Sequence, residues 1–167
     1  MAVDGALRSA LAAEIGVEHV ESLGEISAGA VARYAAAIGD PNPLYSDPAH
    51  ARSRGYADVV APPNFVAAVI NWTAGAPYER LREDGTEADT HLPGVPARGV
   101  RVMGGGEEMT FHEPVVAGMA LTRTTVLREV SERDSSQGAM LVARYRDAYR
   151  DGAGSLLLES VRTVLLR

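Results

Sequence analysis

Residues 34–47 read YAAAIGDPNPLYSD, and this stretch decides the fold assignment. Apolar side chains at helical spacing predict a helix over residues 28–38, which ends inside this stretch, with Ser27 as its N-cap and Gly39 as its stop. The next four residues, Asp-Pro-Asn-Pro at 40–43, cannot continue a helix, because proline lacks a backbone N–H and clashes with the preceding turn. The sequence therefore predicts a helix that ends abruptly in a tight, conformationally restricted loop.

Further helices are predicted on both sides of this stretch. Residues 3–14 have leucines at helical spacing, and a short helix is expected to begin at Pro48 with Asp47 as its cap. The pair Pro62-Pro63 opens a third helix, which we expect at roughly residues 63–73. Its apolar side chains are spread around most of its circumference, which is typical of a buried helix.

From residue 100 onwards the pattern changes to strands rich in Val, Leu, Thr and Tyr. We expect strands at residues 100–102, 107–112, 119–130, 140–149 and 156–166. Hairpin turns are expected at residues 131–137 and 151–154. Helices followed by an antiparallel meander give an α+β fold, in which a curved sheet wraps a central helix, and residues 1–167 form a single domain.

The composition excludes several classes of function. The formal net charge is −6, which argues against nucleic-acid binding and against a polybasic membrane anchor. The chain has no cysteine and no lysine, so thiolate chemistry, lysine Schiff bases and the P-loop motif are absent. The four histidines lack metal-binding spacing, and no apolar run is suited to cross a membrane. A cytoplasmic protein without a metal site is expected.

The run Gly104-Gly105-Gly106 could suggest a phosphate-binding loop. Two glutamates follow it, which would repel a phosphate, and no helix follows to supply N–H donors. A turn or bulge within a strand is the better interpretation.

Three motifs resemble the MaoC-like (R)-specific enoyl-thioester hydratases. Residues 34–47 are similar to the hydratase 2 motif, VAPPNF at 60–65 looks like the entry to the central helix, and FHEPVVAG at 111–118 looks like a strand and its turn. The resemblance covers roughly residues 20–166 and implies the hotdog fold. The Ala-Pro-Pro and Phe-His-Glu-Pro forms look most similar to N-terminal-type domains, which often pair with a catalytic hotdog domain.

The resemblance also implies which residues form the site. Active members use an Asp and a His five residues apart, together with an N–H donor from a Gly at the start of the central helix. Here Asp40 matches the Asp, Tyr45 stands at the His position and Pro63 at the Gly position. We expect Asp40 and Tyr45 as catalytic residues. The expected substrate contacts are Asn42, Pro63, Asn64 and Phe65.

Each assignment has a structural alternative. Asp40 and Asn42 can instead shape the loop by bonding to its backbone, and Tyr45 can simply fill the space that a His would occupy. His112 is expected to face away from the core, from where it can reach the cleft or a dimer face.

Three functions remain open at this point. The first is a non-catalytic partner subunit that binds the acyl or pantetheine part of a thioester and completes the tunnel of an active hotdog chain. The second is a self-sufficient, homodimeric enoyl-thioester hydratase that uses Asp40. The third is another acyl-thioester enzyme, such as a thioesterase. All three need no cofactor beyond the coenzyme A or acyl carrier that bears the substrate, and all imply a homodimer or a heterodimer with a catalytic MaoC-like chain.

Overall fold

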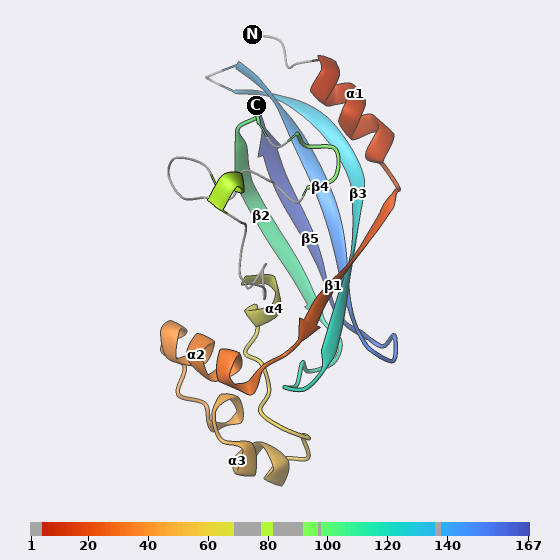
Figure 1. Ribbon diagram of the computed structural model, residues 1–167. Coiled ribbons are helices and arrows are strands. Elements are labelled where there is room, and N and C mark those ends of the chain that lie inside the picture. Colours follow the sequence, from red (N-terminus) through yellow and green to blue (C-terminus); the bar gives the residue numbers. More distant parts are fainter. Residues whose placement is uncertain (1–4, 69–77, 82–91, 97, 136–137) are drawn as a thin grey trace.

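A five-stranded antiparallel sheet forms the centre of the protein, with the strand order β1-β3-β4-β5-β2 (Figure 1). The computed structural model describes residues 5–68, 78–81, 92–96, 98–135 and 138–167. The strands are β1 (Glu18–Glu25), β2 (Val102–Phe111), β3 (Ala120–Ser135), β4 (Gly138–Asp151) and β5 (Leu156–Leu166). The helices are α1 (Gly5–Glu14), α2 (Ala28–Ile38), α3 (Pro48–Ser53) and α4 (Phe65–Ala68), with 3-10 turns η1 (Pro43–Tyr45) and η2 (Tyr78–Arg80).

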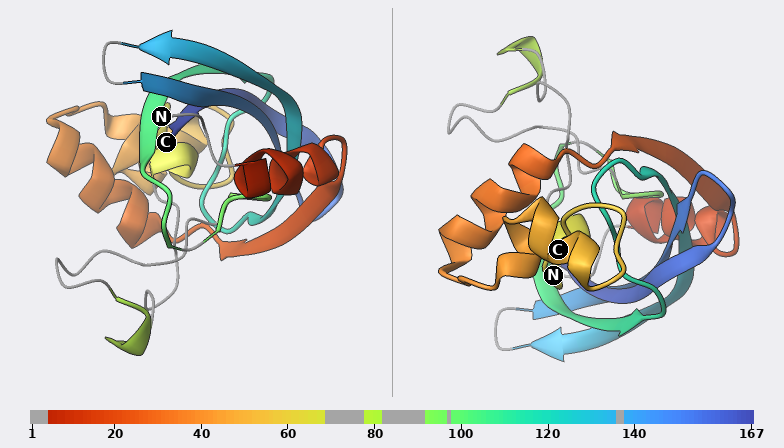
Figure 2. Two further views of the ribbon diagram at one scale, coloured as in Figure 1. Left: turned by 90° about the horizontal axis from the view of Figure 1, so that it is seen from above. Right: turned by 90° about the horizontal axis from the view of Figure 1, so that it is seen from below.

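The sheet curves into an arch with α1 and α4 on its inner side (Figure 2). Two clusters of buried apolar side chains lie on this inner face. One packs around Phe65 and joins α2 and η1 to the sheet. The other packs Leu7 and Leu11 of α1 against Leu127 and Tyr145. Strands β3, β4 and β5 contribute side chains to both clusters, and β1 adds Leu23 to the first.

A polar group separates the two clusters. Asp147 is completely buried in the middle of β4, and the register places Thr125 and Ser160 beside it on the neighbouring strands. Its carboxylate accepts a hydrogen bond of 2.5 Å from Thr125 Oγ1 and two from the guanidinium of Arg162. A buried carboxylate needs such partners, because desolvation would otherwise make its charge very costly.

Several sequence predictions are confirmed. Helix α2 spans residues 28–38, Ser27 caps it by accepting from the N–H of Ala30, and Gly39 ends it in the left-handed conformation at φ 71°. Helix α3 begins at Pro48, and Asp47 caps it. Strand β5 has the predicted bounds, and β3, β4 and β5 are sheet neighbours in chain order, as a meander requires. Strand β2 departs from the predicted meander, because it pairs with β5 and not with β3.

Other predictions were wrong. The first half of the chain is not purely helical, because β1 lies at residues 18–25. Only Leu23 is buried in that strand, so no alternation marks it in the sequence. The turn predicted at residues 131–137 is too long, because β3 continues to Ser135. The third helix begins at Phe65 rather than residue 63, and residues 69–73 of the prediction lie outside the described residues.

The buried carboxylate generates a stability prediction. Replacing Asp147→Ala leaves the Arg162 charge and the Thr125 hydroxyl without their partner, so the free energy of unfolding should fall by about 3 kcal/mol or more. Urea unfolding followed by circular dichroism measures this. The matched control is Asp134→Ala, an exposed aspartate on β3, which should change stability by less than about 0.5 kcal/mol. Equal effects of the two substitutions would contradict a structural role for Asp147.

Candidate functional site

The loop after α2 is shaped by two side chains that bond to its own backbone. Asp40 Oδ1 accepts from the N–H of Asn42 at 3.0 Å, and Asn42 Oδ1 accepts from the N–H of Leu44 at 3.0 Å. These two consecutive turns position η1, in which Tyr45 is buried. The structural alternative for Asp40 and Asn42 is thus visible in the geometry, while a catalytic role of Asp40 stays a prediction.

A largely apolar cavity of about 310 Å³ opens next to this loop. Its walls come from η1, the segment before α4 with one residue of that helix, the end of β2 with the turn that follows it, and one residue of β5. Tyr45, Pro63 and Asn64 line it, together with Leu44, Val60, Ala61, Pro62, Val66, Phe111, His112, Glu113, Pro114, Val115 and Leu158. Its volume is at the lower end of the range for small-molecule sites, and such sites are mostly apolar with a few polar groups.

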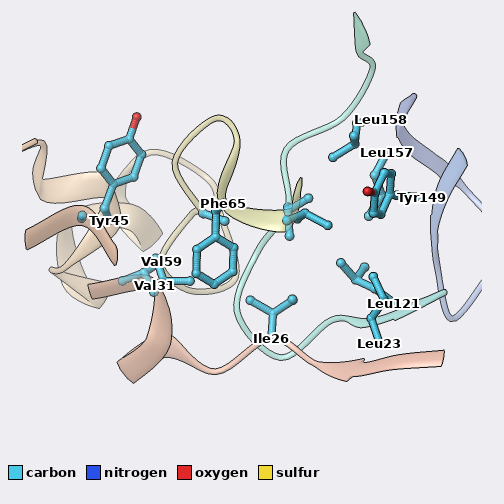
Figure 3. Close-up of a cluster of buried hydrophobic side chains, with 14 residues drawn as sticks. Leu23, Ile26, Val31, Tyr45, Val59, Phe65, Leu121, Tyr149, Leu157 and Leu158 are labelled. Atoms are coloured by element: carbon cyan, nitrogen blue, oxygen red, sulfur yellow. The ribbon is translucent and has the colours of Figure 1, made fainter. Parts of the chain in front are cut away.

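Tyr45 presents its hydroxyl away from the apolar cluster, although the residue as a whole is buried (Figure 3). In the part of the chain that the structure describes, this hydroxyl has no hydrogen-bond partner. It is therefore free to bond to a ligand in the cavity.

The start of α4 has an unusual backbone. Pro62 and Pro63 precede Asn64, which has φ 68° and is the one described non-glycine residue with positive φ. Asn and Asp are the residues that tolerate this conformation best. Since Pro63 has no N–H, the donor that the resemblance implies at this position is missing.

Phe65 lies in the core and not among the side chains that line the cavity. It is fully buried, and its ring meets the ring of Tyr34 edge-on at 5.4 Å (Figure 3 shows its apolar surroundings). The expected contact of Phe65 with substrate stays a prediction, and the structure places this side chain in the core beside the cavity-lining Asn64. The other predicted residues divide: Tyr45, Pro63 and Asn64 meet at the cavity, whereas Asp40 and Asn42 are outside its lining.

His112 is a cavity residue to which sequence patterns assigned no firm role. It is exposed, it lines the cavity, and its Nε2 lies 3.4 Å from Glu159 Oε2. Arg146 also bonds to Glu159. Desolvation alone would raise the pKa of Glu159, but the Arg146 hydrogen bond and charge, with a smaller effect of His112, hold that pKa below its ordinary value. The expectation that His112 can reach the cleft is confirmed, and its place as the second residue of the FHEP stretch was the signal.

The arrangement can bind an apolar chain and contact a polar head group. Among the described residues, no group of three acidic or histidine side chains could hold a metal ion. In the same part of the chain, no helix is long and apolar enough to cross a membrane.

A sequence profile described as the FAS1-like, dehydratase domain region matches residues 13–160, which is most of the chain. The chain belongs to this family. One curated relative, the UPF0336 protein of Streptomyces avermitilis, is 30% identical over 143 residues, covering 86% of this chain and 85% of the relative.

Two solved structures are similar to this chain over nearly its whole length. The ChsH1-ChsH2 complex from Mycobacterium tuberculosis matches with a TM-score of 0.65 at 18% identity, covering 96% of this chain and 88% of that one. The C-terminally truncated HadBC complex, a 3R-hydroxyacyl-ACP dehydratase from the same organism, matches with a TM-score of 0.62 at 17% identity, covering 91% and 96%. At this identity the likeness establishes the fold, which is the hotdog fold that the resemblance implied.

The hydrogen bonds of Asp40 predict how its variants behave. Asp40→Asn keeps an oxygen that can accept from the Asn42 N–H, so its stability should stay within about 0.5 kcal/mol of the parent. Asp40→Ala removes the acceptor and should cost about 1 kcal/mol. Thermal and urea unfolding of the two variants test this. If Asp40→Asn were the less stable of the two variants, the hydrogen bond from the Asn42 N–H would not account for the contribution of Asp40 to stability.

Proposed function

We propose that this chain is the substrate-binding, non-catalytic subunit of an (R)-specific enoyl/3-hydroxyacyl thioester hydratase–dehydratase. The observation that carries the proposal is the composition of the cavity: Tyr45 and Pro63 line it at the positions where the resemblance implies an acid–base His and an N–H donor. The cavity keeps the apolar walls of an acyl site and lacks two parts of the catalytic machinery.

The chemistry explains why these substitutions matter. Adding water to a 2-enoyl thioester needs a base for the water, an acid for C2, and donors for the enolate oxygen. A phenol has an ordinary pKa of about 10, against about 6.5 for an imidazole, so it is a poor base at neutral pH. Proline offers no N–H to the enolate oxygen. In this proposal the partner chain supplies the base and the donor.

The residues of this chain would then bind and orient the substrate. The apolar walls around Ala61 and Val66 hold the acyl chain, since they exclude water from it. The hydroxyl of Tyr45 and the amide of Asn64 bond to the thioester carbonyl or to the pantetheine arm. The carrier is coenzyme A or an acyl carrier protein, and no further cofactor takes part.

Two features of similar proteins support a two-chain enzyme. Both solved structures described above are complexes of two different chains, and one of them, HadBC, is a 3R-hydroxyacyl-ACP dehydratase. The family match to a dehydratase region supports the same reaction class.

The first test is hydration of trans-2-enoyl-coenzyme A esters by the purified chain alone, with Asp40→Asn measured in parallel. We expect no turnover for either protein. Turnover that is lost in Asp40→Asn would overturn the proposal in favour of a self-sufficient hydratase. Release of free coenzyme A would instead indicate a thioesterase, and a thiol reagent detects it without background because the chain has no cysteine.

The second test is binding. We expect trans-2-octenoyl-coenzyme A to bind the chain in calorimetry, and Ala61→Phe to weaken that binding about tenfold or more by filling the cavity. Ala36→Phe, on an exposed position of α2, is the matched control and should bind like the parent. Equal affinities of the two variants would show that the cavity does not hold the acyl chain.

The third test is reconstitution. We expect the neighbouring gene to encode a hotdog chain with the Asp and His intact, and an equimolar mixture of the two chains to hydrate the ester that this chain binds. A partner that is equally active without this chain would contradict a subunit role.

A further inference from the structure

Strand β2 is an uncovered edge of the sheet. It pairs with β5 on one side, and nothing within the described residues pairs with its other side (Figure 1). Its apolar ends are open to solvent, since Val102 is 36% and Phe111 is 51% exposed. Phe111 also lines the cavity, so a chain docked along β2 would close one wall of the candidate site. An exposed, extended edge of this kind readily accepts another strand.

The regular part of this edge is short. A bulge occupies Gly104–Gly106, where the register with β5 shifts. A Cβ on Gly105 would lie 2.9 Å from Thr163 Cγ2, and Gly106 has φ 132°, so neither position tolerates a side chain. A partner strand must therefore form its regular pairing along residues 107–111.

That regular part begins with two exposed carboxylates, Glu107 and Glu108. As neighbours on a strand they point to opposite faces of the sheet. Neither forms an ion pair or a side-chain hydrogen bond within the described residues. Arg162 is the cross-strand neighbour of Glu107, but its guanidinium bonds to Asp147. Both carboxylates thus carry unneutralised charge at the edge.

A second copy of this chain fits such an edge badly. If two β2 strands pair antiparallel about a two-fold axis anywhere between Gly106 and Met109, glutamates of one copy lie opposite or diagonal to glutamates of the other. Like charges at these positions destabilise a strand pair. The net charge of −6 per chain adds to the repulsion.

We propose that Glu107 and Glu108 make the β2 edge selective for a different hotdog chain, one whose edge strand places Arg or Lys side chains opposite these carboxylates. This inference rests on the proposed function, which identifies the partner as the catalytic subunit. The charge pattern of the edge then decides that the enzyme assembles as a heterodimer and that this chain does not pair with itself.

A charge-reversed copy of the chain serves as the probe. Wild type and Glu107→Arg/Glu108→Arg are measured alone and as an equimolar mixture by native mass spectrometry and sedimentation velocity at low salt. We expect each protein alone to be mainly monomeric and the mixture to give a one-to-one heterodimer. The mass difference between the two chains distinguishes this heterodimer from either homodimer.

Neutral variants separate charge from shape. Glu107→Gln/Glu108→Gln should self-associate about tenfold more tightly than wild type, and about 1 M NaCl should strengthen self-association of the wild type by screening the repulsion. The control Glu18→Gln/Glu25→Gln removes two exposed carboxylates from β1, the opposite edge, and should leave association unchanged. Thermal unfolding confirms that all variants are folded.

Two results would overturn the inference. One is a wild-type homodimer whose affinity is insensitive both to salt and to the glutamine substitutions. The other is a mixture that gives no heterodimer while the glutamine variant is as monomeric as wild type. Because no thioester is present, these results are independent of the proposed function: a homodimer that binds octenoyl-coenzyme A refutes only the edge selectivity, and a selective edge without acyl binding refutes only the acyl-binding role.

Discussion

The burial of Phe65 is the contact on which the candidate site depends. Its side chain lies inside the cluster that joins α2 and η1 to the sheet, and replacing such a side chain by alanine typically costs about 3–5 kcal/mol. The left-handed backbone at Asn64 turns this ring inward while Pro63 and Asn64 stay at the cavity. One apolar anchor therefore fixes the relative positions of the loop that carries Tyr45 and the segment that faces it.

The sequence predicted the structural features that depend on residues close to one another in the chain. The cap at Ser27, the stop at Gly39 and the Asp47-Pro48 helix start each depend on side chains within a few residues, and the structure has all three. The bulge at Gly104–Gly106 was also recognisable from the residues around it. The shared cavity position of Tyr45, Pro63 and Asn64 came from the family resemblance and not from residue patterns.

What could not be predicted depends on contacts between distant segments. Strand β1 buries only Leu23, because it is an edge strand whose pairing with β3 holds it in place without a patterned face. The position of Phe65 depends on the φ value of its neighbour, and spacing alone does not reveal this. His112 reaches the cavity because the turn after β2 brings it there, and its contact with Glu159 spans 47 residues of sequence.

The buried Asp147 divides the inner face of the sheet into two apolar clusters, one around α2 and the cavity and one around α1. Contact between the two apolar clusters is interrupted where the Asp147 carboxylate bonds to the Arg162 guanidinium. Within the described residues, strands β3, β4 and β5 run through both clusters and link the two ends of the arch. The ion pair therefore marks the boundary between the apolar cluster that adjoins the cavity and the apolar cluster beneath α1.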